Sequence, residues 1–147
     1  LATEFARAGV AVQVSKQVNS ALWSKLIINC AYNALSAVTQ LPYGRLIQGE
    51  GIETVMRAAV DEALAVAQAS HVDVAPDIWQ QVLAISNTMA SQASSTAQDL
   101  ASGRRTEIDF LNGHVVRPGT QFGIATPVHQ TLLSLVKTLE AKRDQRL

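Results

Sequence analysis

The sequence predicts an all-α fold, and three observations carry this prediction. Apolar residues recur at intervals of three and four along most of the chain, which is the spacing of one face of an α-helix. Residues typical of helix boundaries, mainly Ser, Asn, Thr, Pro and Gly, separate these stretches. The chain has 147 residues, of which 48% are hydrophobic and 16% charged, so it can bury a core. Such a composition excludes a disordered chain and indicates surface buried in a core, a partner or a further domain.

Residues 1–17 are predicted to differ from the helical remainder, residues 18–147. The residues before Gly9 have the pattern of the end of a helix, and 10–14 alternate as a short strand followed by a linker. One strand cannot form a sheet. It therefore either adds to the edge of a sheet or is the last strand of a sheet that lies upstream. The chain begins with Leu1 rather than methionine, and we interpret it as a fragment.

The first long helix is predicted from Asn19, which suits an N-cap, to Gln40. A helix that is apolar nearly all round is predicted to be buried, and its apolar positions are Leu22, Trp23, Leu26, Ile27, Cys30, Ala34, Leu35 and Val38. Lys25, Asn29 and Asn33 interrupt it at four-residue steps and form one polar stripe roughly 12 Å long. We interpret the stripe as half of a binding site. The alternative is a set of satisfied core amides with a lysine that reaches solvent.

A turn is predicted at residues 41–44, and a second, amphipathic helix follows Gly51. Its apolar stripe consists of Ile52, Val55, Met56, Ala59, Val60, Ala63, Leu64 and Ala67. Asp61 and Glu62 could form a carboxylate pair for acid–base chemistry. We favour a solvated face for them, because no neighbouring residue in the sequence would perturb the pair.

A third helix is predicted to start at Pro76, with Trp79 in the core or at an interface, and its core face is formed by Ile78, Val82, Ile85 and Met89. The stretch 88–102 is rich in small polar residues, as linkers are. We reject a linker, because Ser94 and Ser95 suit the cap of a short helix.

Gly103 is predicted to close this short helix, and the paired serines would leave its first N–H groups free for an anion. A further helix is then predicted to begin near Glu107 and to be interrupted near Gly113. A loop containing Pro118, Gly119 and Gly123 is predicted to follow.

The closing helix is predicted to begin at Thr126 and Pro127, an N-cap followed by proline at the first helical position. Its core stripe consists of Leu132, Leu133, Leu135, Val136 and Leu139. The charged tail from Glu140 onward is predicted to fray.

Several classes of function are disfavoured by the sequence. The formal net charge is zero, so no basic surface for binding nucleic acid is expected. No apolar run is long enough to span a membrane. The single cysteine, Cys30, forbids an internal disulfide and favours a reducing compartment, with the cytoplasm as the default. His71, His114 and His129 show no ligand spacing, so no metal site is expected. No glycine-rich loop for a dinucleotide occurs.

Four motifs together resemble a known family. They are Trp23-Ser-Lys-Leu-Ile-Ile-Asn-Cys-Ala-Tyr-Asn33, Ser94-Ser-x-x-Gln-Asp99, Arg105-Thr-Glu-Ile-Asp-Phe-Leu-Asn-Gly113 and Gly123-Ile-Ala-Thr-Pro127. In this order they are similar to the C-terminal helical domain of ketopantoate reductase (2-dehydropantoate 2-reductase). The resemblance implies a 6-phosphogluconate dehydrogenase C-terminal-like fold. It also favours the second interpretation of residues 10–14, as the last strand of a preceding Rossmann domain.

The resemblance further implies an NADPH-dependent oxidoreductase that reduces ketopantoate to pantoate in pantothenate (vitamin B5) biosynthesis. Lys25 would be the catalytic general acid, and Glu107 would assist catalysis and could contact the cofactor. Asn29, Asn33 and Ser95 would bind the substrate. NADPH would be bound mainly by the Rossmann domain, so the fragment alone would be inactive. Asp99 and Asp109 would be structural motif residues.

The sequence departs from the family at one position, which is none of the site residues named above, and two alternative assignments stay open. The sequence has His129 where the family usually has asparagine. The chain could instead be the helical domain of another 2-hydroxyacid dehydrogenase acting on a different 2-keto acid. It could also be a non-catalytic helical association module. As an enzyme, the protein could form a homodimer. A lysine inside a buried helix argues against the module.

Overall fold

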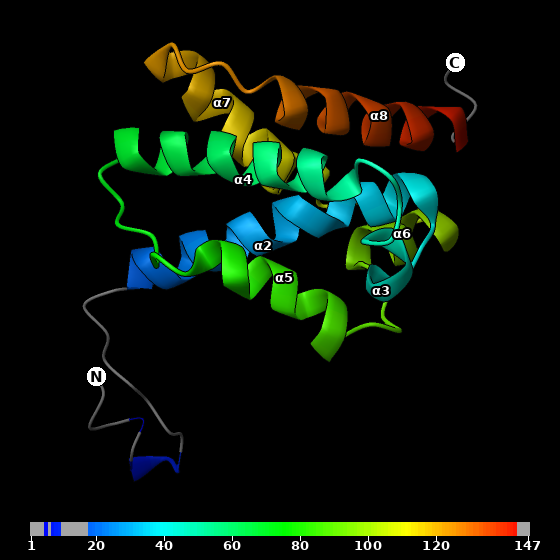
Figure 1. The fold of residues 1–147 in the computed structure, drawn as a ribbon, viewed down its shortest axis with the longest axis horizontal. Coiled ribbons are helices and arrows are strands. Elements are labelled where there is room, and N and C mark those ends of the chain that lie inside the picture. Colours follow the sequence, from blue (N-terminus) through cyan, green and yellow to red (C-terminus); the bar gives the residue numbers. More distant parts are fainter. Residues whose placement is uncertain (1–4, 6, 10–17, 144–147) are drawn as a thin grey trace.

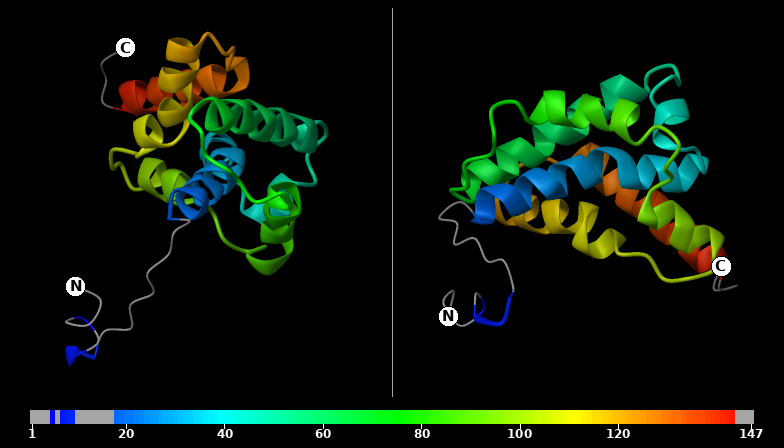
Figure 2. Two further views of the ribbon diagram at one scale, coloured as in Figure 1. Left: turned by 90° about the vertical axis from the view of Figure 1, so that its left-hand side faces the viewer. Right: turned by 90° about the horizontal axis from the view of Figure 1, so that it is seen from below.

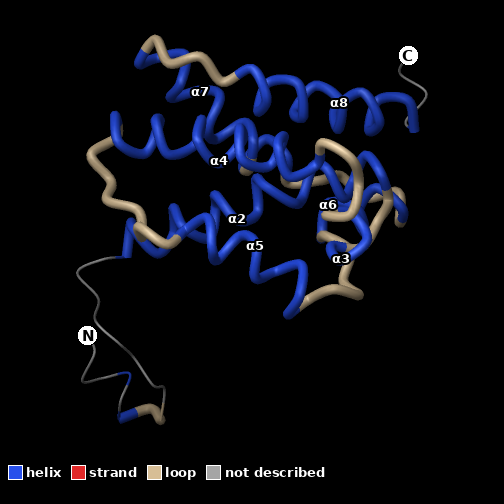
Figure 3. The backbone as a smooth tube through the Cα atoms, viewed as in Figure 1, coloured by secondary structure: helices blue, strands red, loops and turns tan. Residues whose placement is uncertain are grey.

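The computed structural model describes residues 5, 7–9 and 18–143 of the chain. Helices joined by loops make up this part, and no strand occurs within it (Figures 1 and 3). The elements are α2 (Val18–Thr39), α3 (Tyr43–Leu46), α4 (Ile52–Ala69), α5 (Ile78–Thr88), α6 (Ser95–Ala101), the 3₁₀ turn η1 (Ile108–Phe110), α7 (Asn112–Phe122) and α8 (Pro127–Arg143). The predicted all-α fold is confirmed.

Helix α2 is the centre of the domain. It contacts α3, α4, α5, α6 and α8, and two perpendicular views show the other helices arranged around it (Figure 2). Its buried apolar residues lie in its second half, apart from Ile27 just before the midpoint, and are Ile27, Cys30, Ala31, Tyr32, Ala34, Leu35 and Ala37. The prediction of a buried helix is therefore correct for this half. The first half is more exposed, and Leu22 keeps 59% of its surface accessible.

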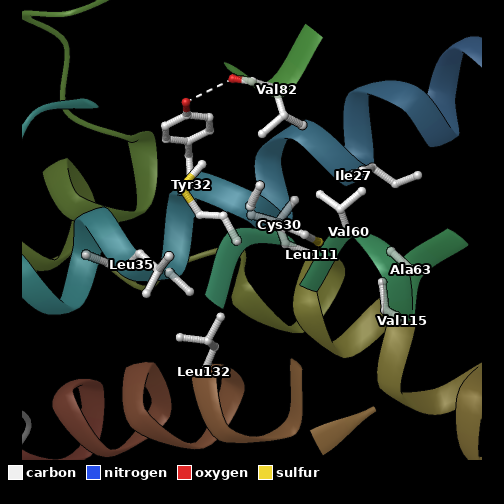
Figure 4. Packing of buried hydrophobic residues seen from close by; sticks show 14 of the residues in the cluster. Ile27, Cys30, Tyr32, Leu35, Val60, Ala63, Val82, Leu111, Val115 and Leu132 are labelled. Atoms are coloured by element: carbon white, nitrogen blue, oxygen red, sulfur yellow. Dashed lines mark hydrogen bonds between the residues drawn. The ribbon is translucent and has the colours of Figure 1, made fainter. Parts of the chain in front are cut away.

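The core around α2 is formed by side chains from α3, α4, α5, α6, η1, α7 and α8, and Figure 4 shows part of it. The hydroxyl of Tyr32 donates a hydrogen bond of 2.9 Å to the Val82 carbonyl, so a buried polar group is satisfied while α2 is joined to α5 (Figure 4). Tyr43 packs against Tyr32 with ring centroids 4.8 Å apart. Burial raises the pKa of the Cys30 thiol, which agrees with a structural rather than a nucleophilic cysteine.

Some predicted boundaries are wrong by a few residues. Asn19 lies inside α2 rather than capping it, and residues 43–46 form the short helix α3 where a turn was predicted. Pro76 lies in a turn before α5, which starts at Ile78. Local residue preferences define the ends of helices only to within one or two residues. The helix α3 is also held by backbone hydrogen bonds from Tyr43 and Gly44 to residues 92 and 90.

The region around Pro118 was predicted to be a loop but is helical. Pro118 and Gly119 lie inside α7 rather than in a loop. The helix continues past the proline because its buried face packs on α4 and α8, and this packing overrides the local tendency of proline to end a helix. It ends at Gly123, whose φ is 69°. The N–H groups of Gly123 and Ile124 bond back to Thr120 and Gly119, as in a Schellman motif.

Glu62 was predicted to be solvated and Glu140 to lie in a frayed tail. Both carboxylates instead accept hydrogen bonds from backbone N–H groups of distant elements. The Glu62 carboxylate accepts hydrogen bonds from the N–H groups of Val128 (2.9 Å) and His129 (3.0 Å) at the start of α8. The Glu140 carboxylate accepts from Thr106 N–H at 2.7 Å, within a helix that continues to Arg143. Both predictions are wrong because the partners are distant in sequence. Asp61 is exposed, as predicted, and it pairs with Arg57 on the surface.

The predicted strand 10–14 and most of the preceding element lie outside the described residues. Phe5 and Arg7 are helical, and Gly9 has a φ of 74°, as suits a residue that ends a helix. Among the described helices, none is both long and apolar enough to cross a membrane.

Candidate functional site

A groove of about 500 Å³ lies beside the first half of α2 and contains the start of the polar stripe. Lys25 and Asn29 line it, together with Ser20, Ala21, Ser24, Ile28, Ala75 and Gln81. Lys25 is exposed and Asn29 is half-buried. Two of the three residues of the predicted polar stripe therefore line one groove.

The local sequence explains why α2 carries a hollow here. Ile27 and Cys30 face the core, so Lys25 and Asn29, one turn apart, are left on the outer side. The neighbouring positions Ala21 and Ser24 have small side chains, which leave space between α2 and α5.

Asn33, the third residue of the stripe, is placed differently. It is only 4% exposed and does not belong to the lining of the groove. Its backbone carbonyl accepts a hydrogen bond of 3.1 Å from the Ser94 hydroxyl. The stripe therefore runs from an open groove at Lys25 to a closed contact with the start of α6.

The start of α6 has the predicted cap. The Ser94 hydroxyl accepts a hydrogen bond from Ala97 N–H at 3.0 Å, so Ser94 is the N-cap and Ser95 is the first helical residue. Ser94 is fully buried, whereas Ser95 is exposed. Gly103, with a φ of 69°, follows the end of the helix as predicted. The Ser95 side chain is thus presented to solvent by a helix that is fastened to α2.

Glu107 is exposed and precedes η1. Its carbonyl accepts hydrogen bonds from the N–H groups of Phe110 and Leu111, but the residue does not line the groove of Lys25. The structure therefore brings Lys25 and Asn29 together in one groove, whose lining does not include Glu107, and joins Asn33 to the Ser94–Ser95 cap. The aspartates of the motifs make ion pairs: Asp99 with Arg104 (2.9 Å) and Asp109 with Lys137 (2.6 Å).

Sequence reasoning missed three polar residues of the groove. Ser20 and Ser24 lie one turn apart on α2, and this spacing beside Lys25 was a usable signal. Gln81 comes from α5, and no local pattern indicates that it faces α2.

The groove presents an ammonium group, two carboxamides and two hydroxyls. These groups can donate several hydrogen bonds and supply one positive charge, which suits a small ligand with carbonyl and carboxylate oxygens. No cluster of three or more metal-ligating side chains was found among the described residues.

Comparisons with known proteins agree on one family. Residues 17–140 match the family model for the ketopantoate reductase PanE/ApbA C-terminal domain. A 2-dehydropantoate 2-reductase of Vibrio cholerae is 40% identical over 141 residues, which is 95% of this chain and 47% of that protein. The chain spans about half the length of the curated relatives it matches.

Solved structures show the same similarity. The PanE/ApbA family ketopantoate reductase from Ralstonia eutropha is 54% identical with a TM-score of 0.92, covering 97% of this chain and 48% of that one. A D-mandelate dehydrogenase in complex with NADH is 25% identical with a TM-score of 0.85, covering 98% of this chain and 48% of that one.

Proposed function

Because the chain belongs to the family of ketopantoate reductase C-terminal domains, we propose that the protein that carries it is an NADPH-dependent 2-dehydropantoate 2-reductase. In this role it reduces ketopantoate to pantoate for pantothenate biosynthesis. The observation that supports the proposal most directly is the groove in which Lys25 and Asn29 lie side by side. The domain supplies the substrate-binding and proton-donating half of the site.

Lys25 is the proposed general acid. Reduction of a keto group places negative charge on its oxygen, and a positioned ammonium group both stabilises that charge and supplies the proton. Lys25 is the cationic side chain in the lining of the groove, and it is exposed on the outer side of α2, where a ligand can reach it. Asn29, one turn further along, donates a hydrogen bond to the substrate beside it.

Ser95 and Asn33 are proposed to complete the substrate site at the other end of the stripe. Ser95 is accessible at the start of α6, and this helix is bonded to the Asn33 carbonyl through Ser94. Asn33 is nearly buried, so its contribution is a single contact at the closed end. Glu107, directly before η1, is proposed to assist when the substrate and cofactor are bound.

NADPH supplies the hydride when it is bound. The described part of this chain is helical, whereas a dinucleotide-binding fold is built on a parallel sheet. We therefore place the cofactor mainly on a preceding Rossmann domain, with residues 1–17 as its end and the linker. Glu107, exposed ahead of η1, is the residue of this chain proposed to contact it. A cytoplasmic location fits the single reduced cysteine, Cys30.

A second candidate is favoured by the similarity to D-mandelate dehydrogenase at 25% identity. The same helical domain would then serve a different 2-keto acid with NADH. The two candidates share the role of Lys25 and differ in the side chain that the groove accepts.

The test is to measure turnover by the full-length protein on ketopantoate, benzoylformate and pyruvate, each with NADPH and with NADH. We expect the highest kcat/KM for ketopantoate with NADPH. A preference for benzoylformate with NADH would establish the second candidate instead. Absence of reduction with every substrate would contradict both and leave a non-catalytic association domain.

A further inference from the structure

Ser36 lies on α2 three residues after Asn33 and is completely buried. Its hydroxyl donates a hydrogen bond of 2.8 Å to the Leu41 carbonyl, so its single proton is already used. The same oxygen accepts a hydrogen bond of 3.2 Å from Ser94 N–H. Ser36 thus joins α2, the loop after α2 and the start of α6 through one oxygen atom.

Ser94 has a second hydrogen bond to α2, made by its side chain. Its hydroxyl donates to the Asn33 carbonyl at 3.1 Å, while its N–H group donates to Ser36. A single hydrogen bond fixes a distance but permits rotation about itself. Two bonds from different atoms of one residue to two positions on α2 also fix orientation. The next residue, Ser95, is therefore held in a defined direction relative to the polar face of α2.

The segment that leads into Ser94 is fastened to α3 as well. Gly44 N–H donates to the Ala90 carbonyl and Tyr43 N–H donates to the Gln92 carbonyl, each at 2.9 Å. A Cβ atom added to Gly44 would lie 2.8 Å from the Cβ atom of Ala90, so the two backbones are in close contact. The start of α6 is thus fixed on its α3 side independently of Ser36. Loss of Ser36 would remove one of its two bonds to α2 and leave only the bond from the Ser94 hydroxyl to the Asn33 carbonyl.

We infer that Ser36 is a positioning residue for the substrate site, acting through Ser94 to set the place of Ser95. The inference rests on the proposed function, in which Ser95 binds the 2-keto acid. Removing the Ser36 oxygen would leave the Ser94 N–H group buried without a partner, and such a group is costly to leave unsatisfied. The start of α6 would shift to recover a partner, and Ser95 would move with it.

The experiment compares Ser36→Ala, Ser95→Ala and the double variant in the full-length protein. We expect Ser36→Ala to raise KM for ketopantoate about three- to tenfold, the worth of one hydrogen bond. kcat and KM for NADPH should change by less than about twofold, because Lys25 keeps its place on α2. The double variant should resemble Ser95→Ala alone, since a residue that acts through another shows no separate effect once that residue is gone.

Ser70→Ala is the matched control. It removes a serine hydroxyl that donates at 2.8 Å to the Val66 carbonyl at the end of α4, away from α6. It should lower the melting temperature without changing KM. An equal rise in KM for Ser70→Ala would show general destabilisation and overturn the inference. Additive effects of Ser36→Ala and Ser95→Ala would overturn it too.

Ser36→Cys keeps a weak acceptor and donor, so it serves if Ser36→Ala does not fold. Ser36→Cys should raise KM for ketopantoate, by less than Ser36→Ala if both variants fold. This rise should vanish when Ser95 is also replaced by alanine. If Ser36→Ala does not fold and Ser36→Cys leaves KM unchanged, the inference is overturned while the proposed function stays intact. If the unsubstituted protein does not turn over ketopantoate, both the inference and the proposed function are overturned. This result would be known before any variant is made.

Discussion

The imidazole of His129 and the carboxamide of Asn112 hydrogen-bond to each other inside the core, 3.2 Å apart and both fully buried. The other ring nitrogen, Nε2, lies 2.9 Å from the Ala59 carbonyl and must therefore carry the proton. Nδ1 then accepts from the Asn112 amide, so the ring is neutral with both nitrogens used. One side chain of α8 thereby joins α4 and α7.

This arrangement predicts that acid destabilises the domain. Burial lowers the pKa of His129 below its ordinary value of 6.5, against smaller opposing effects from the Ala59 carbonyl and the Glu62 charge. In the window between the lowered pKa and 6.5 the unfolded chain binds the extra proton, so stability falls as pH falls. We expect the urea midpoint to drop as the pH is lowered through 6.5 toward the lowered pKa of His129. His129→Asn should flatten this part of the profile, and an equally steep profile in that variant would assign the effect to other groups.

Glu62→Ala is predicted to destabilise the start of α8. The carboxylate bonds two N–H groups that have no partner within the helix, and its negative charge is favourable at a helix N-terminus. The expected loss is about 1–2 kcal/mol in the free energy of unfolding, measured by urea titration. Asp61→Ala is the neighbouring control. It removes only an exposed pair with Arg57 and should cost less than about 0.5 kcal/mol. Equal losses would contradict the capping role.

Lys25→Ala is predicted to impair chemistry. If Lys25 donates the proton, kcat should fall by about 10²–10⁴, the contribution of general acid catalysis. KM for NADPH should barely change, because the cofactor is held mainly elsewhere. Lys25→Arg should restore little, since a guanidinium keeps the charge but does not release a proton near neutral pH. Lys142→Ala, another exposed lysine, controls for loss of surface charge. Near-normal turnover in Lys25→Ala would remove it from the mechanism.

Ser95→Ala is predicted to weaken substrate binding. Loss of a hydrogen bond to a charged carboxylate is worth about 1.5–3 kcal/mol, so KM for ketopantoate should rise roughly ten- to a hundredfold. Steady-state kinetics of the full-length protein measure this directly. Ser102→Ala, an exposed serine after the other end of α6, should leave KM unchanged. The same KM in Ser95→Ala and the unsubstituted protein would exclude Ser95 from the site.

The 147-residue chain expressed alone is predicted to fold as a helical domain and to bind NADPH negligibly. The described core is formed by its own helices, and the sequence has no glycine-rich dinucleotide loop. Circular dichroism should show a helical spectrum, and calorimetry with NADPH should show no binding in the micromolar range. Micromolar affinity for NADPH would place the cofactor site in this domain and refute the proposal that a preceding domain binds most of the cofactor.

Much of the fold could be predicted locally. The periodic apolar stripes located α2, α4 and α8, and the Ser94 cap and Gly103 located the two ends of α6. These features depend on residues within one or two turns of each other, so a linear pattern contains the information. The proximity of Lys25 and Asn29 was predictable for the same reason, since four residues in a helix place two side chains on one face.

Tertiary packing decided the rest. Glu62 meets its partners 66 and 67 residues away, and His129 meets the Ala59 carbonyl 70 residues away. Gln81 enters the groove only because α5 packs on α2, and Pro118 stays helical only because α7 is packed. A hydrogen bond or a helix end that depends on a distant element leaves no periodic trace in the sequence. Such a contact stabilises the structure only once the helices have assembled around α2.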